Sequence, residues 1–415
     1  MNFLEQLKTL SPRQRNVVTA CFLGWALDAF DFFILVFVIK DIAKEFGTDV
    51  TAVTFTLFLT LAMRPLGALL FGVIADRYGR RPTLMANILF YSVVEFASGF
   101  APSLTALIAL RALFGIAMGG EWGVGASLTM ESIPPQTRGF ISGVLQAGYP
   151  TGYLLATLVY WTLYPYIGWR GMFMVGVVPA LLVVYIRSKV EESPAWLESE
   201  HKNKGQQMWS TIADRWPLFV YMIVLMTAFN FFSHGTQDLY PTFLQVQRKF
   251  PQPTVAAIAV TYNIGAIVGG LTFGTISETI GRRRAICIAA LLALPVVPLW
   301  AFSMSPMWLA IGAFVMQFLV QGAWGVIPVH LNELSPPDVR GTFPGFTYQL
   351  GNLFAAANAT IQADLAERWG GNYAQALAVV ILIVAIAVFS ITAFGPEAKW
   401  VLFSREAVTT GQPRQ

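Results

Sequence analysis

Twelve apolar runs, each close to the length of a membrane-spanning helix, occupy most of the 415-residue sequence. A helix needs about 20 mostly apolar residues to cross the hydrocarbon core of a bilayer. The runs cover residues 17–40, 51–75, 83–100, 103–130, 139–162, 168–187, 216–246, 253–278, 284–303, 306–332, 341–364 and 373–395. They predict an all-α membrane protein with twelve transmembrane helices.

Charged residues are scarce, which leaves lipid as the main solvent of the folded chain. The composition is 55% hydrophobic and 12% charged, and that charged share is about half of what soluble domains carry. The net charge is only +4, and the basic residues lie in short loops rather than in one patch, so we expect no nucleic-acid partner. Cys21 and Cys287 lie inside apolar runs and predict buried side chains, with no metal site and no cofactor.

The basic residues fall unequally on the two sides of the predicted membrane. Of the 27 lysines and arginines, 19 fall on the side of both termini, 6 on the other side, and Arg64 and Arg111 within runs. Loops rich in Lys and Arg stay in the cytoplasm. We therefore expect both termini in the cytoplasm and the chain in the inner or plasma membrane. The first run is too long for a signal peptide and carries two aspartates, so we expect it to be a retained span.

The two halves of the sequence repeat each other. An offset of 202 residues aligns the Gly-Arg-Arg turn at 79–81 with the turn at 281–283, and it also aligns Glu131 with Glu333 and Arg138 with Arg340. We predict a six-helix half over 1–187, a cytoplasmic linker over 188–215 and a second half over 216–415. An even number of spans in each half makes the repeats parallel, with a binding site between them near the membrane midplane.

A short loop after the second run resembles a family signature. The segment Gly72-Val-Ile-Ala-Asp76-Arg77-Tyr-Gly79-Arg80-Arg81 is similar to the signature loop of the major facilitator superfamily, with a weaker copy over 274–284. The resemblance implies two six-helix bundles that rock around a central cavity in a monomer. It also implies a cytoplasmic gate latched by charged residues, namely Asp76, Arg77, Arg80, Glu131, Glu278, Arg282 and Glu333. Charges that only set the topology are the alternative.

A longer motif in the seventh run resembles a narrower group. Residues 230–242 match the pattern N-x-x-[ST]-H-x-[ST]-Q-D-x-x-x-T, which is similar to the signature of the lactate/pyruvate–proton symporters within the sialate–proton symporter group. Segments 24–31 and 119–123 also resemble this group. Sialic acid members carry extra spans between their halves, whereas this chain has only the linker, which favours a short monocarboxylate.

Polar residues inside the seventh run form the first candidate site. Asn230, His234 and Asp238 are four residues apart and share one face of a helix, with Gln237 beside them. Charged groups at membrane depth are costly and are therefore candidates for function. We expect Asp238 to be the main proton carrier, while His234 shares the proton or binds substrate together with Asn230 and Gln237. A hydrogen-bonded cluster between helices is the alternative.

Polar residues of the first half supply the remaining candidates. Arg64 lies in the middle of the second run, and its guanidinium can grip a carboxylate through two hydrogen bonds. A structural ion pair with Asp28, Asp31, Glu95 or Glu121 is the alternative for Arg64. The carboxylates that we expect to relay protons are Asp28, Asp31 and Glu121, and the further substrate contacts are Tyr149 and Gln349. Glu95 and Arg111 are more typical of a structural pair.

These patterns predict a proton-coupled symporter of lactate, pyruvate or another short monocarboxylate, working by alternating access. The expected partners are the carboxylate, the proton and the bilayer. One alternative is transport of a larger organic acid such as sialic acid, or of a sugar. Another is a transport-inactive nutrient sensor, which normally has a longer cytoplasmic tail. We do not expect an enzyme, because no nucleophile or metal-ligand set accompanies the polar residues.

Overall fold

The computed structural model describes residues 9–199 and 204–403, which form helices and no strands within these ranges. The helices of the first half are α2 (Pro12–Glu45), α3 (Val50–Tyr78), α4 (Arg80–Ser98), α5 (Leu104–Ser132), α6 (Arg138–Gln146), α7 (Gly148–Val175) and α8 (Ala180–Lys189). Between the halves lie α9 (Pro194–Glu198) and α10 (Lys204–Asp214).

The second half is built in the same order. Its helices are α11 (Trp216–Gln237), α12 (Tyr240–Thr242), α13 (Gln252–Ile280), α14 (Arg282–Ala293), α15 (Pro306–Leu334), α16 (Phe343–Ala355), α17 (Asn358–Arg368) and α18 (Tyr373–Phe394). Two π-helical segments, Phe243–Gln247 and Pro298–Phe302, continue α12 and follow α14.

Each of the twelve predicted runs coincides with a helix or with consecutive helical segments. Among the described residues, eight helices are long and apolar enough to cross a membrane, and the segments Pro135–Val175 and Ala180–Lys189 form a further pair bent by 42°. The predicted runs 139–162 and 168–187 lie on that pair, and a break at Gly168 divides α7 between them. The run 83–100 is α4, which carries three charged residues, and the run 341–364 is divided between α16 and α17.

Two glycines make the tight turns that the repeated signature loop requires. Gly79 joins α3 to α4 with a φ of 110°, and Gly281 joins α13 to α14 with a φ of 99°. Residues with a side chain rarely adopt such angles. The turns bring Arg80 and Arg282 to the first positions of α4 and α14, where each side chain points into its own half.

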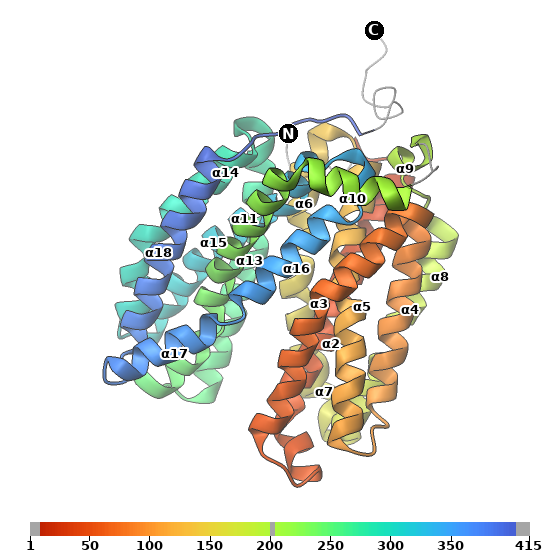
Figure 1. Cartoon of the computed structure of the whole chain (residues 1–415). Helices are drawn as coiled ribbons and strands as arrows, with labels where there is room; N and C mark the ends of the chain where they lie inside the picture. The colour runs from red at the N-terminus through yellow and green to blue at the C-terminus, as the bar shows by residue number, and fades with distance from the viewer. Residues whose placement is uncertain (1–8, 200–203, 404–415) are drawn as a thin grey trace.

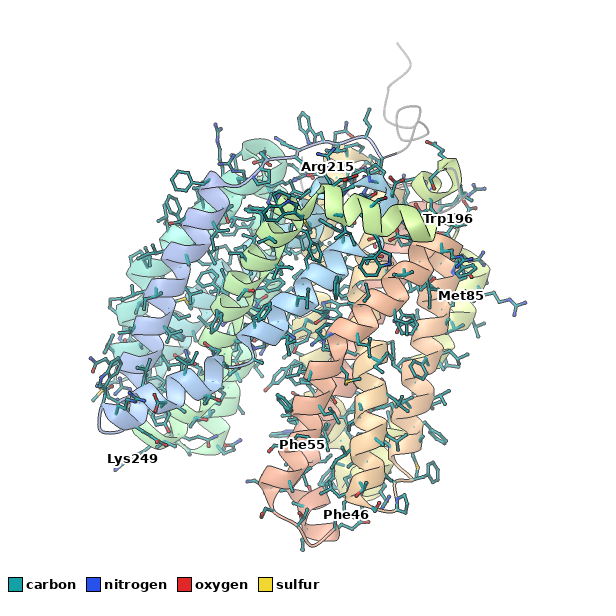
Figure 2. All side chains as sticks on the ribbon, viewed as in Figure 1. Phe46, Phe55, Met85, Trp196, Arg215 and Lys249 are labelled. Atoms are coloured by element: carbon teal, nitrogen blue, oxygen red, sulfur yellow. The ribbon has the colours of Figure 1, made fainter. Side chains whose placement is uncertain are left out.

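The halves lie side by side and meet most closely at one end, which we call the linker end (Figure 1). Helices α9 and α10 and both ends of the described chain lie there, while the ribbons of the two halves diverge toward the opposite, far end. Figure 2 labels Trp196 and Arg215 at the linker end and Phe46 and Lys249 at the far end. Near the linker end the backbones of the two halves are in close contact at Gly123 of α5 and Gly345 of α16. A Cβ atom added to Gly123 would lie only 2.7 Å from the Cα of Gly345.

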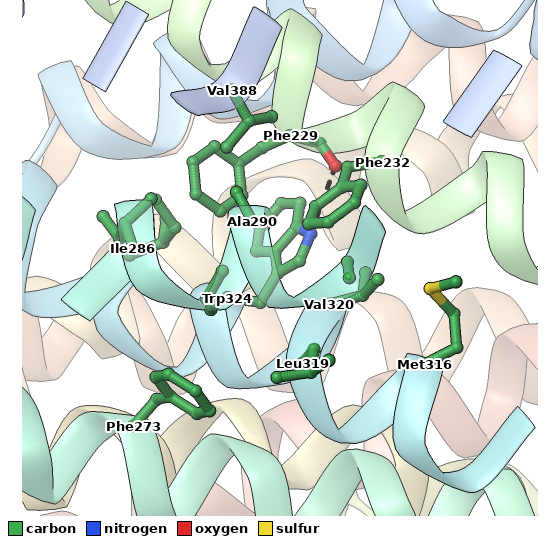
Figure 3. Close-up of a cluster of buried hydrophobic side chains, with 14 of the residues drawn as sticks. Phe229, Phe232, Phe273, Ile286, Ala290, Met316, Leu319, Val320, Trp324 and Val388 are labelled. Carbon is green, nitrogen blue, oxygen red and sulfur yellow. Dashed lines mark hydrogen bonds between the residues drawn. The ribbon is translucent and has the colours of Figure 1, made fainter. Parts of the chain in front are cut away.

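Each half has a core of large apolar side chains, and its outer surface is apolar as well. In the second half, Phe229 and Phe232 surround Trp324, whose indole Nε1 donates to the Phe229 carbonyl at 3.2 Å (Figure 3). Outer positions such as Leu181, Val184 and Ile383 are 69%, 68% and 64% exposed. An apolar exterior of this kind is suited to lipid contact.

Candidate functional site

Arg64 on α3 lies at the boundary between the halves and is only 3% exposed. Its guanidinium carbon lies 5.9 Å from the ring centroid of Tyr348 on α16 of the other half. Its Nε and Nη2 atoms are buried and have no hydrogen-bond partner among the described residues. These two atoms form one edge of the guanidinium. An unsatisfied charged donor at this depth is costly, so this edge is a candidate site for an anion.

One tyrosine from each half lies near Arg64, and each packs against tryptophan. The ring of Tyr348 lies 4.7 Å from Trp122 and 5.5 Å from Trp324, measured between centroids, and these two tryptophans are themselves 202 residues apart. Tyr149 packs against Trp25 at 5.4 Å, and Arg64 lies close enough to Tyr149 to interact with it electrostatically. The structure therefore brings the predicted residues Arg64 and Tyr149 together.

The polar helix face predicted for the seventh run lies on α11 and contains a histidine–aspartate pair. His234 Nδ1 lies 3.2 Å from Asp238 Oδ1, and His234 Nε2 lies 2.9 Å from the Asn352 side-chain oxygen. Because an amide oxygen only accepts, Nε2 carries a proton. The contact between Nδ1 and Oδ1 then needs one further proton, which belongs either to the imidazole or to the carboxyl group. The side chains are 31% and 37% exposed, so the pair is accessible.

Asn230 and Gln237, the other two polar residues predicted on this helix, make contacts inside the second half. Gln237 donates to Gln317 Oε1 at 3.0 Å, and Gln317 donates to Thr236 Oγ1 at 2.8 Å. Asn230 donates to the Met226 carbonyl of its own helix at 2.7 Å. For Gln237, these contacts favour the alternative of a hydrogen-bonded cluster between helices. Gln349 is fully buried, and neither polar atom of its side chain has a partner among the described residues.

Three polar residues of this region were missed by the sequence analysis. They are Asn352, which contacts His234, and Gln317 and Gln321 on α15. Gln321 donates to Ser233 Oγ at 2.9 Å, so both glutamines face α11. The sequence did contain a signal for Gln317 and Gln321, since two glutamines four residues apart within an apolar run share one polar face of a helix.

The three predicted proton carriers of the first half lie in its core. Asp28, Asp31 and Glu121 are at most 1% exposed, and none of their carboxylate oxygens has a hydrogen-bond partner among the described residues. The hydroxyl of Tyr91 is buried nearby and is also unpartnered. In contrast, Glu95 and Arg111 form a buried ion pair at 2.5 Å, as the structural interpretation of these two residues predicts.

Charged residues at the linker end form two copies of one network, which we call the latch. In the first half, Arg80 donates to both oxygens of Glu131 at 3.1 Å and lies 3.0 Å from Asp76. In the second half, Arg282 donates to both oxygens of Glu333, at 2.9 and 3.2 Å, and lies 3.3 Å from Glu278. Six of the seven predicted gate residues thus belong to the latch. Arg77 is exposed beside Tyr78 and lies outside it.

The two latch copies are joined reciprocally across the halves. Asp76 accepts from the Gly341 and Thr342 backbone N–H groups at 2.8 and 2.9 Å, while Glu278 accepts from the Gly139 N–H. The ion pairs follow the same rule, because Arg340 lies 3.7 Å from Glu131 and Arg138 lies 3.8 Å from Glu333. Each of these contacts between the halves therefore occurs twice, with the roles of the two halves exchanged.

Two further carboxylates complete the latch. Glu192 accepts from the backbone N–H groups of Arg80 and Arg81, and Glu397 accepts from those of Arg282 and Arg283. Each glutamate follows the last long helix of its half, α8 or α18, and binds the N-terminus of a helix, α4 or α14. Burial raises the pKa of Glu192 above its ordinary value, although the N–H groups it accepts from act in the opposite direction. The sequence analysis missed both residues because they are 205 residues apart, outside the offset of 202.

Two helical bundles that meet at a latched end, with unpaired charges between and within them, are typical of a membrane transporter. Residues 21–359 match the model of the Major Facilitator Superfamily, and the chain belongs to this superfamily. It is an integral membrane protein with that fold.

Comparisons with known proteins agree with this assignment. The chain is 29% identical to the carboxylic acid transporter protein homolog of Saccharomyces cerevisiae, over 89% of this chain and 64% of that protein. It is 28% identical to the sialic acid transporter NanX of Escherichia coli, over 94% and 95% of the two chains. The structure matches that of the proton:xylose symporter XylE with a TM-score of 0.74 at 18% identity, over 95% and 99% of the chains. These proteins are transporters and not enzymes, as expected for this chain.

Proposed function

We propose that this protein is a proton-coupled symporter that moves a short monocarboxylate, such as lactate or pyruvate, by alternating access between its halves. The observation that carries the proposal is the unpaired edge of Arg64 at the boundary between the halves. The motif over 230–242 and the two acid-transporting relatives, whose names specify carboxylic acid and sialic acid, support an organic acid as substrate.

Two ion pairs of this protein illustrate how Arg64 would hold a carboxylate. Arg80 and Arg282 each use Nε and Nη2 to grip both oxygens of a glutamate, at 2.9 to 3.2 Å. Arg64 offers the same two atoms without a partner. Such paired hydrogen bonds to a carboxylate are strong and directional. Since both atoms are buried, we expect the substrate to reach them when the Tyr348 ring moves aside.

Proton coupling is assigned to the pair of His234 and Asp238. His234 Nδ1 lies within hydrogen-bond distance of the Asp238 carboxylate, and both side chains are partly exposed. A carboxylate bound at Arg64 brings a negative charge, and a proton on the pair compensates for it during the crossing. Asp28, Asp31 and Glu121 are the second candidates for proton carriers, because a buried carboxylate without a partner is costly when ionised. Asn230, Tyr149 and Gln349 are assigned to shaping the substrate site, whereas Gln237 is assigned to the amide cluster with Gln317.

The latch provides the gate of the proposed cycle. Opening the linker end requires the contacts across the halves to break, namely those of Asp76 with Thr342, Glu278 with Gly139 and the two long ion pairs. The pairs within each half, Arg80 with Glu131 and Arg282 with Glu333, can persist. If the linker end is cytoplasmic, as the basic residues predict, the structure represents the state closed to the cytoplasm. The protein is proposed to act as a monomer in the inner or plasma membrane.

Uptake into proteoliposomes tests the proposal. Labelled L-lactate is supplied with and without an inward proton gradient, and unlabelled pyruvate or sialic acid is added in excess. We expect uptake driven by the gradient that pyruvate inhibits and sialic acid does not. Sialic acid transport is the second candidate, since NanX matches the chain over nearly its whole length. If sialic acid inhibits the uptake and labelled sialic acid accumulates, the substrate is sialic acid rather than lactate.

A further inference from the structure

A basic pocket opens at the linker end of the second half, between the start of α14 and the end of α18. Its volume is about 590 Å³, and its lining includes Arg283, Arg284, Lys399, Glu397, Cys287 and Ala393. We propose that this pocket binds the phosphate of an anionic phospholipid headgroup. The site is separate from the proposed substrate site and does not depend on the proposed transport function.

The three cations of the pocket outnumber its single acid, and two of them are held in place by hydrogen bonds. Glu397 uses its two oxygens to accept from the Arg282 and Arg283 backbone N–H groups, at 3.2 and 3.0 Å. Arg283 Nε donates to the Thr392 carbonyl at 2.9 Å, and Lys399 Nζ donates to the Thr279 carbonyl at 3.1 Å. These contacts fix the positions of the two cations without neutralising their charge.

Arg284 has no structural task in the second half. It is exposed, and no hydrogen bond or ion pair of its side chain occurs among the described residues. The offset of 202 places Pro82 at the equivalent position of the first half and Leu197 at the position of Lys399. The repeated scaffold therefore requires neither cation, although it does repeat the neighbouring Arg81 as Arg283.

The location of the pocket favours a lipid over a soluble anion. Helices α14 and α18 belong to two of the apolar spans, and Figure 1 shows their upper ends side by side at the linker end. Below the pocket, α18 exposes Ile383, Ile386 and Phe394 at 64%, 53% and 91%. A phospholipid matches both parts, with its phosphate among the cations and its acyl chains on the apolar faces. Basic pockets between membrane helices suit such headgroups.

Binding of fluorescent phosphatidylglycerol to the purified full-length chain in a neutral detergent tests this inference. We expect saturable binding that fluorescent phosphatidylcholine does not reproduce. Because each basic residue near an anionic headgroup contributes about fivefold to affinity, we expect Arg284→Gln to weaken binding by about fivefold and Arg284→Gln with Lys399→Gln by about thirtyfold. Arg284→Lys should retain most of the affinity.

A matched control separates the pocket from general charge attraction. Arg215 is an exposed arginine at the same end of the molecule, outside the pocket lining, and Arg215→Gln should leave the affinity unchanged. Equal binding of the two lipids, or equal losses in the Arg215 and Arg284 variants, would overturn the proposal. Displacement by inorganic phosphate at the concentration of the lipid would also overturn it and identify a soluble anion as the ligand. A failure of lactate transport leaves all of these outcomes unaffected.

Discussion

The two halves of this protein are near copies at the linker end and differ at the depth of the substrate site. At the linker end, Arg80 with Glu131 and Arg282 with Glu333 form equivalent pairs of equivalent geometry. Further toward the membrane centre, the offset of 202 pairs Arg64 with Ala266 and Glu121 with Ala323. Duplication has therefore preserved the latch, whereas the proposed site for anion and proton depends on residues that only one half carries.

The halves also differ in how their buried carboxylates are satisfied. In the second half, Glu278 and Glu333 both pair with Arg282. In the first half, Arg64, Asp28 and Glu121 retain buried polar atoms without partners among the described residues. Buried ionisable groups without partners destabilise a fold, so they are candidates for binding a ligand or a proton. The asymmetry thus assigns most of the chemistry to the first half and to the exposed pair on α11.

The largest effect is expected at Arg64, because no equivalent residue can replace it. Arg64→Gln should lower kcat/KM for lactate uptake by about a hundredfold, since a charged hydrogen-bonding partner of the carboxylate is lost. Arg64→Lys keeps the charge but not the two-atom grip and should remain impaired by at least about tenfold. Initial uptake rates in proteoliposomes measure both variants.

Arg77 provides the control for these variants. It lies on the same helix, is exposed and stands outside the latch, so Arg77→Gln should transport like the wild type. Unchanged lactate affinity in Arg64→Lys would argue against a bidentate grip. Equal losses in the Arg64 and Arg77 variants would show that the effect reflects general charge rather than the site.

The next effect concerns coupling rather than binding. Asp238→Asn removes the carboxylate that contacts His234 and that we propose as the proton carrier. We expect lactate exchange across the membrane to continue, while the stimulation of uptake by an inward proton gradient falls to about one. The measurement is the ratio of uptake rates with and without the gradient. If the variant keeps the full ratio, Asp238 is not the proton carrier, and that role passes to Asp28, Asp31 or Glu121.

A smaller effect, equal in the two halves, is expected from the ion pairs that cross between them. Arg138→Gln and Arg340→Gln each remove an ion pair between the halves, together with side-chain hydrogen bonds to backbone carbonyls. Each should shift the equilibrium toward an open linker end by at least about fivefold, since an exposed pair contributes up to about 1 kcal/mol and these pairs are buried. Distances between spin labels at positions 77 and 279, with both native cysteines replaced, report the shift. Clearly unequal shifts would mean that the latch copies have diverged in function.

The smallest effect is expected for the amide cluster of the second half. Gln317→Leu leaves Gln237 without one hydrogen-bond partner and Thr236 without another. Transport should fall by about threefold or less, and the chain should lose about 1 kcal/mol of stability. Uptake rates and thermal unfolding in detergent test this pair of expectations. A loss comparable to that of Arg64→Gln would make the cluster part of the substrate site.

Sequence reasoning predicted the helices and the latch because both depend on repeated or periodic features. The twelve apolar runs follow from bilayer thickness, and Arg80 and Arg282 follow from the repeat. It did not identify Asn352, because a single asparagine in an apolar run does not specify its partner. Glu192 and Glu397 were missed because they are 205 residues apart and the repeat pairs residues 202 apart. Whether Arg64 pairs with a carboxylate depends on the packing of four helices, which no local pattern encodes.

The most direct test of the central proposal is to measure internal pH while lactate flows into vesicles with no proton gradient imposed. Vesicles with the Arg64→Gln variant correct for diffusion of undissociated lactic acid. If anion and proton cross together, inward lactate flux through the wild-type protein should acidify the interior faster than in that control, and Asp238→Asn should abolish the difference. Lactate accumulation through the wild-type protein without additional acidification would contradict proton-coupled symport.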